Sequence, residues 1–234
     1  MSALPARIAL EGGEMPLLVS RHPRARRFVL RLDALGEAVE LVLPAWGSTR
    51  EAARFLEQNR GWLEARLKDL PPRIAFTDGI AVPMLGVSHR IRHVAQARGR
   101  GSAWIEDGEI CVSGELAHLP RRVRDFLRET ARCELNRRAR ELASRLERRV
   151  ARVSLRDSRS RWGSCSAKGA LSFSWRLVLA PEAVLDYVVA HEVAHLVEMN
   201  HGPRFWALVE KLTPDYRAPR SWLRRNRMRL LRFG

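Results

Sequence analysis

The stretch that decides the fold covers residues 181–201 and reads PEAVLDYVVAHEVAHLVEMNH. A proline at its first position presets the backbone for a helix, and the glutamate that follows suits the positive end of the helix dipole. At about 100° of rotation per residue, His191, Glu192 and His195 fall on one side of this helix, while aliphatic residues cover the opposite side. We therefore expect a helix from 181 to about 199 that anchors itself in a core and turns two imidazoles and a carboxylate toward a cavity.

The spacing of these three residues indicates a metal site. Two histidines one turn apart can hold a zinc ion, and the glutamate of an HExxH pattern can accept a proton from water at the metal. Composition alone produces such a string in about one chain in a hundred. The alternative to a metal site is a buried His–Glu pair that only forms hydrogen bonds in the core. A further imidazole, His201, favours the metal interpretation, because Asn200 before it tolerates the left-handed backbone that ends a helix and lets the chain turn back.

Three histidines would leave the fourth position of a tetrahedral zinc ion open, as a catalytic site requires. The sequence thus predicts zinc held by His191, His195 and His201, with Glu192 as the general base. Glu198 is the alternative third ligand, since it follows His195 by about one turn on nearly the same helix face. A metzincin would have glycine at that position and a later Met-turn, for which the arginine-rich tail offers only a weak match, so we do not expect an ordinary metzincin.

Strand and helix patterns lead up to this helix. A long helix is expected from 120 to about 149, where apolar residues recur three or four apart. Alternating residues then predict strands over 153–155, 160–165 and 171–179. If the substrate is a peptide, we expect 171–177 to be an exposed edge strand onto which an extended chain adds.

The first part of the chain is rich in short strands separated by turn signals. Apolar residues alternate there with a period of two, and a Pro/Gly/Ser segment marks the start of a helical pattern. The expected elements are strands over 17–20, 27–32 and 38–43, a helix capped by Ser48 or Thr49, a second helix near 62–67 and short strands between 73 and 114.

Composition limits the classes of protein to which the chain can belong. The 234 residues include 42 basic and 26 acidic ones, a net charge of +16, but only three of the basic residues are lysines. Because a GC-rich genome produces such an arginine excess without selection, a nucleic-acid partner is possible and not favoured. No window is long and apolar enough for a membrane helix, and no signal pattern opens the chain, so we expect a cytoplasmic protein that does not engage a membrane. The three cysteines are far apart, which argues against a disulfide framework.

Four motifs occur in order around the histidine helix. They are RWGSCS at 161–166, SFSWRLVLAP at 172–181, DYVVAHEVAHL at 186–196, and NHG followed by FW at 200–206. Together they resemble the YgjP-like metallopeptidase family, which is related to the SprT-like and WLM zincins, over about residues 15–230. The resemblance implies a minimal zincin fold with zinc on the three histidines and Glu192 as base. Members are classed as peptidases, whereas hydrolysis of a nucleoside triphosphate of the UTP type has been assigned to a bacterial member, so both reactions stay open.

These observations predict an α+β fold with a domain boundary near 114–120. A β-rich α+β region, residues 1–115, would precede a zincin-like helix and sheet region, residues 116–234, which carries the HExxH helix. The absence of a Gly/Ser linker leaves open that the two regions pack as one unit.

Three residues besides the ligands are candidates for substrate binding. Tyr187 lies one turn before His191, where its hydroxyl can hydrogen-bond an oxyanion, and a ring packed in the core is the alternative. Arg161 and Arg176, together with Arg159, can hold a carboxylate or a phosphate, and solvated strand-face arginines are the alternative. We expect Cys165 to be a small buried residue.

The sequence favours a zinc-dependent hydrolase that acts on peptides, ahead of one that acts on nucleotides, which would need an arginine-lined pocket close to the metal. A nucleic-acid-associated zinc-binding module is a different class, and it would need four protein ligands and no open position. The tail 217–232 has seven arginines and no acid, which keeps this class open. An amphipathic terminal helix that docks through Trp222, Met228 and Leu231 explains the same tail.

Overall fold

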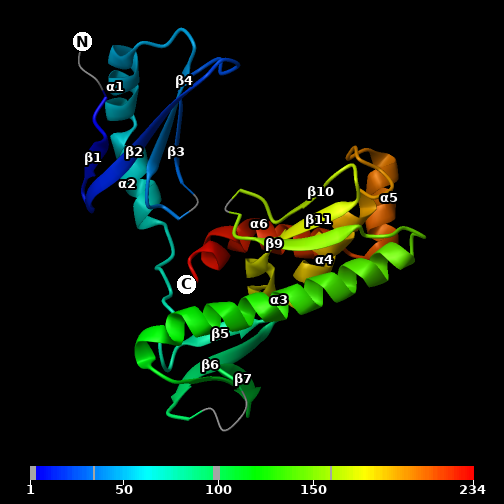
Figure 1. Cartoon of the computed structure of the whole chain (residues 1–234). Coiled ribbons are helices and arrows are strands. Elements are labelled where there is room, and N and C mark those ends of the chain that lie inside the picture. Colours follow the sequence, from blue (N-terminus) through cyan, green and yellow to red (C-terminus); the bar gives the residue numbers. More distant parts are fainter. Residues whose placement is uncertain (1–3, 34, 97–100, 159) are drawn as a thin grey trace. The chain divides into compact units, whose positions relative to one another are not determined.

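The computed structural model describes residues 4–33, 35–96, 101–158 and 160–234, and Arg159, one of the predicted anion-binding arginines, lies outside them. The chain divides into two compact units, Met1–Pro72 and Arg73–Gly234. Each unit contains both helices and strands (Figure 1). The predicted α+β fold class is confirmed.

The first unit consists of strands β1 (Arg7–Leu10), β2 (Gly13–His22), β3 (Val29–Leu32) and β4 (Val39–Pro44) and helices α1 (Thr49–Gln58) and α2 (Arg60–Lys68). The sheet has the order β1-β2-β4-β3, in which β2 and β4 are parallel and the outer pairs are antiparallel. Leu17, Val39 and Leu41 are buried in a core that the helices share. Ser48, one of the two predicted caps, forms a capping box with Glu51 at the start of α1.

The second unit begins with a sheet of β5 (Ala81–Met84), β6 (Val87–Val94), β7 (Ala103–Glu106) and β8 (Glu109–Ser113) in the order β5-β6-β8-β7. A short 3₁₀ turn, η1 (Leu116–His118), leads into the long helix α3 (Leu119–Ser144). Ile91 and Ile110 of the sheet lie in one core with Val123 and Leu127 of α3. The domain boundary that we expected near 114–120 therefore falls inside this unit, because α3 covers the apolar face of the sheet.

A second, three-stranded sheet follows α3 and consists of β9 (Arg152–Arg156), β10 (Gly163–Cys165) and β11 (Ala170–Ser174). Its order is β10-β11-β9, so β11 is the central strand and not the exposed edge that we predicted for 171–177. The edge strand that packs against the histidine helix is β10.

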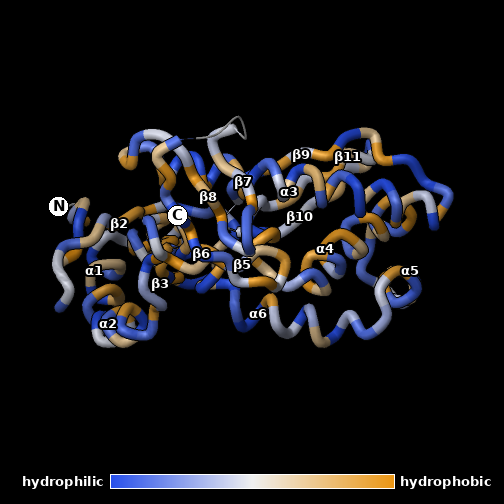
Figure 2. Tube along the Cα trace, turned by 90° about the horizontal axis from the view of Figure 1, so that it is seen from below, coloured by the Kyte–Doolittle hydropathy of each residue, from blue (hydrophilic) through white to orange (hydrophobic). Residues whose placement is uncertain are grey.

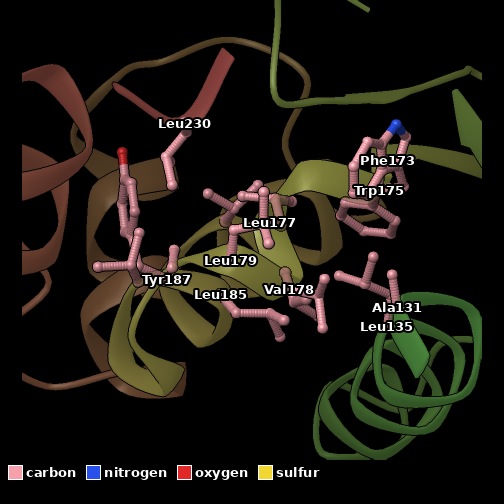
Figure 3. Packing of buried hydrophobic residues seen from close by; sticks show 14 of the residues in the cluster. Ala131, Leu135, Phe173, Trp175, Leu177, Val178, Leu179, Leu185, Tyr187 and Leu230 are labelled. Atoms are coloured by element: carbon pink, nitrogen blue, oxygen red, sulfur yellow. The ribbon is translucent and has the colours of Figure 1, made fainter. Parts of the chain in front are cut away.

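The strand predicted over 171–179 is too long by five residues. Residues Trp175–Leu179 form a 3₁₀ turn, η2, in which every side chain is buried. Figure 3 shows Leu177, Val178 and Leu179 packed among the apolar side chains of the same core. Alternation in the sequence cannot distinguish this turn from a strand, because a segment buried on all sides has no exposed face to reveal its period.

Three further helices complete the second unit: α4 (Glu182–Ala194), α5 (Pro203–Leu212) and α6 (Arg217–Leu231). Nine of the thirteen residues of helix α4 are buried and hydrophobic positions predominate in it, whereas hydrophilic positions dominate α6 (Figure 2). Helix α6 docks through its buried residues Leu223, Leu230 and Leu231. Of the residues that we predicted for this contact, Leu231 is buried and Trp222 is partly buried. Among the described residues, no helix combines the length and the apolar character needed to cross a membrane.

Candidate metal centre

The three predicted imidazoles meet at the end of α4. This helix stops at Ala194 and not near 199, and His195 follows at its C-cap. The chain then turns, with the N–H of Gly202 donating to the carbonyl of Asn200 at 2.7 Å, and places His201 directly before α5. Nε2 of His191 and Nε2 of His201 are 3.1 Å apart, and the candidate ligand atoms of all three histidines lie within 4.8 Å of one another.

His191 and His195 have properties that a metal site needs. The Nδ1–H of His195 donates to the backbone carbonyl of Glu198 at 3.0 Å, which leaves Nε2 as the free donor atom. Burial, together with the charges of the other two histidines, lowers the pKa of His191 to about 4. Burial also lowers the pKa of His195. Imidazoles that are neutral near pH 7 and converge within a few ångströms fit a divalent transition metal.

Glu198 serves this arrangement through its backbone carbonyl, which accepts from His195, and through its carboxylate, which accepts from the turn before His201. Because α4 ends four residues earlier, the carboxylate is no longer on the helix face from which we considered it as a ligand. Its Oε1 accepts a hydrogen bond from the N–H of Asn200 at 3.2 Å, inside the turn that leads to His201. In the part of the chain that the structure describes, the group of side chains close enough to share a metal consists of the three histidines alone.

Glu192 is buried beside this cluster and is held by a glycine of β10. A Cβ atom on Gly163 would lie 2.5 Å from Oε1 of Glu192, so only glycine leaves room for the carboxylate in this position. Burial raises the pKa of the carboxyl to about 7, against an opposing effect of the Arg161 charge. The RWGSC motif supported the resemblance, but nothing in the sequence connected its glycine with the glutamate of the helix.

Aromatic side chains of α5 form a wall behind the histidines. The ring of Phe205 is fully buried and lies 4.5 to 4.9 Å from the rings of His191, His195 and His201. Trp206 lies 5.9 Å from the His191 ring. Such packing fixes the orientation of the imidazoles before a metal arrives, which reduces the entropy lost on binding.

Arg220 of α6 comes close to the centre, which sequence reasoning missed. Its guanidinium lies 4.7 Å from the centre of the Trp206 ring, and its charge adds to the lowering of the His191 pKa, for which burial is the main cause. We treated it as one of seven equivalent tail arginines. No signal in the sequence could have selected it, because its position depends on how α6 packs against α4.

The other predicted substrate residues occupy different environments. Tyr187 is buried, with its ring 6.0 Å from that of His191. Arg161 is exposed and lines a cavity of about 280 Å³. Arg176 is buried, donates to Asp157 at 3.1 Å and to the carbonyl of Phe233, and these contacts favour a structural role.

A smaller cavity of about 190 Å³ opens directly beside the metal centre. His191 and Glu192 form its polar side, and most of the remaining wall is apolar. The other lining residues are Trp162, Gly163, Tyr187, Val188 and Leu223.

Comparison with protein families agrees with the geometry. A family model described as YgjP-like, metallopeptidase domain matches residues 26–226, a range that contains the three histidines, Glu192 and Gly163. Comparisons with curated proteins and with solved structures returned no match. The predicted resemblance is confirmed: the chain belongs to the YgjP-like metallopeptidase family.

Proposed function

We propose that this protein is a zinc-dependent peptidase. The observation that carries the proposal is the meeting of three imidazoles, a buried carboxyl with a pKa near 7 and a largely apolar cavity at one place. His191, His195 and His201 would hold the ion. When bound, zinc would lower the pKa of a water molecule and polarise the carbonyl under attack.

Glu192 is the proton carrier in this proposal. Its carboxylate accepts a proton from the attacking water and passes it to the leaving amine. A group that exchanges protons in both directions works best with a pKa near the operating pH, and burial raises the pKa of Glu192 to about 7. The buried carboxylate can do this because Gly163 leaves it room next to the histidines.

Tyr187 is the candidate donor to the oxyanion. Burial raises the pKa of its phenol, so the hydroxyl keeps its proton at neutral pH and can donate a hydrogen bond. Its ring lies beside that of His191, on the wall of the smaller cavity.

The substrate follows from the surroundings of the centre. Strand β10 pairs with β11 on one side and lies at the edge of its sheet on the other, so an extended peptide can add to it next to Glu192. The apolar wall of Val188, Leu223 and Trp162 suits an aliphatic or aromatic side chain of such a peptide.

Hydrolysis of a nucleoside triphosphate is the second candidate function. The larger cavity is lined by Arg156 and Arg161 and by several serines, and it shares Trp162 and Gly163 with the smaller one. An arginine-lined cavity so close to Glu192 is the feature that we required for phosphate recognition.

Activity on matched substrate panels tests the proposal. Zinc-loaded protein is incubated with a peptide library and with the common nucleoside triphosphates, and chelator-treated protein is the control. We expect peptide cleavage that the chelator abolishes and zinc restores. Turnover of nucleotides without peptide cleavage would overturn the peptidase proposal in favour of the second candidate.

A further inference from the structure

Two loops meet at one end of the sheet in the first unit, far along the sequence from the metal centre. Strands β2 and β4 run parallel with His22 opposite Pro44, so the loops that follow them leave from the same end (Figure 1). Arg21 joins these loops, because its Nη1 donates to the carbonyls of Pro44, Ala45 and Gly47 at 3.2, 3.0 and 2.7 Å. These three hydrogen bonds tie the loop that follows β4 to the end of β2.

This loop presents an indole to solvent. Trp46 is 64% exposed, more than any other large hydrophobic side chain among the described residues. Its ring contacts that of Phe28 edge-to-face at 5.8 Å, and Phe28 in turn stacks on Phe55 at 5.6 Å. The indole is thus supported from behind while much of its surface stays open, which is a suitable arrangement for stacking on a flat ligand.

The segment after β2, which places Phe28 against the indole, also carries positive charge. Arg24, Arg26 and Arg27 are exposed, and no side-chain ion pair links them to an acid within the part of the chain that is described. Other arginines of the same unit do have such partners: Arg7 pairs with Glu14, and Arg31 pairs with Glu40. Among the described residues, the charge of these three arginines is therefore not paired with an acidic side chain, which favours a polyanionic ligand.

We propose that Trp46, Phe28, Arg24, Arg26 and Arg27, named here the Trp46 patch, bind single-stranded nucleic acid. The guanidiniums contact phosphates and the indole stacks on an unpaired base. A duplex offers phosphates, but its bases are already stacked and cannot reach the indole. One indole with three guanidiniums also gives little apolar surface for anchoring in a bilayer. This binding site lies outside the metal centre and does not depend on the proposed peptidase activity.

Fluorescence anisotropy with the full chain tests the proposal. The probe is a labelled oligothymidine of about 12 nucleotides, titrated at several salt concentrations. The variants are Arg24→Ala/Arg26→Ala/Arg27→Ala and Trp46→Ala. The matched control removes three exposed arginines of α6, Arg224→Ala/Arg225→Ala/Arg229→Ala, and so makes the same change in net charge.

The two patch variants should act differently. The patch triple variant should weaken binding more than tenfold and reduce the slope of log K against log[salt] by about 2, since three phosphate contacts are lost. Trp46→Ala should weaken binding about 5- to 100-fold with little change in that slope, and Trp46→Phe should restore most of the affinity. The α6 variant should bind within about twofold of the wild type.

Several results would overturn the proposal. Equal losses in the two triple variants would mean that total charge, and not the patch, attracts the oligonucleotide. The proposal also fails if the wild type does not bind at low salt, or if it binds a duplex or phosphatidylserine vesicles more tightly than the single strand. Circular dichroism melts of every variant separate loss of binding from loss of the fold.

Discussion

Helices α4 and α6 both bring ionisable groups to the metal centre, but they hold them in different ways. In α4 most residues are buried, and neighbours fix both chemical groups: Phe205 packs on His191, and Gly163 packs on Glu192. In α6 the arginines are mostly exposed, and the leucines alone are buried. Arg220 is placed near the centre by its contact with Trp206.

The difference shows how burial converts a local pattern into a fixed site. A group on a buried helix has its position set by the packing of its own turn, so the spacing of His191, Glu192 and His195 already determines which of them converge. A group on an exposed helix is free unless a specific contact holds it. The five predictions below test this contrast, first at the buried site and finally at the exposed helix.

The largest effect is expected at the buried carboxyl. Glu192→Gln preserves the size of the side chain but cannot accept a proton, so kcat should fall about 10²- to 10⁴-fold with the metal still bound. Steady-state kinetics and metal analysis of the same preparation measure this. Near wild-type turnover would exclude Glu192 as the general base, and loss of zinc would show instead that it supports the ligands.

The next effect concerns the ligand set. His201→Ala should weaken zinc binding about 100-fold or more, because it removes a donor atom from the cluster. Glu198→Ala should weaken it less, because the carbonyl that orients His195 belongs to the backbone and is retained. Competition with a fluorescent chelator gives both affinities, and equal losses would contradict the assignment.

The contact between β10 and α4 can be broken with one methyl group. Gly163→Ala would push against Oε1 of Glu192, and a displacement of about 1 Å lowers kcat about 100-fold. Gly61→Ala in α2 is the control, since its added Cβ meets nothing within 4 Å. Activity unchanged in Gly163→Ala, at normal zinc content, would mean that the position of the carboxylate is not critical.

Stability of the metal-free protein should report the raised pKa of Glu192. The carboxyl titrates near 7 in the folded chain and near 4.5 when unfolded, so its protonation favours the folded state. This contribution is full below the unfolded pKa and is lost as the pH rises through 7. Between about pH 5 and pH 8, the wild type should lose about 2 kcal/mol of unfolding free energy relative to Glu192→Gln. Urea denaturation of both proteins at both pH values measures the free energy of unfolding. An equal change of this free energy with pH in the two proteins would rule out the raised pKa of Glu192.

The smallest effect tests the exposed helix. Arg220→Ala should reduce kcat/KM about tenfold, since a cation next to His191 is available to an anionic group of the substrate or to the developing oxyanion. Arg224→Ala, on the same helix, should change it less than twofold. An equal kcat/KM in the two variants would show that Arg220 acts only as a solvated surface arginine.

Much of the fold could be predicted where one face of an element meets water. Helix α3 shows a period of three to four residues because its exposed face carries polar residues, and β4 buries Val39, Leu41 and Leu43 with a period of two. The predictions were wrong where an element has no exposed face. Trp175–Leu179 is buried on every side and forms a turn instead of a strand. Strand β11 lies in the middle of its sheet because the distant strand β9 pairs with its second edge.

The sequence by itself determined the family and the local geometry of α4, because His191, Glu192 and His195 are related by the fixed rotation of a helix and His201 by a short turn. It left undetermined everything that depends on contacts between distant segments. Only the tertiary structure decided that Gly163 makes room for Glu192, that Arg176 is buried against Asp157, and that Arg220 lies next to the centre. These positions are set by how whole elements pack against one another, and that packing depends on the shapes of many side chains at once.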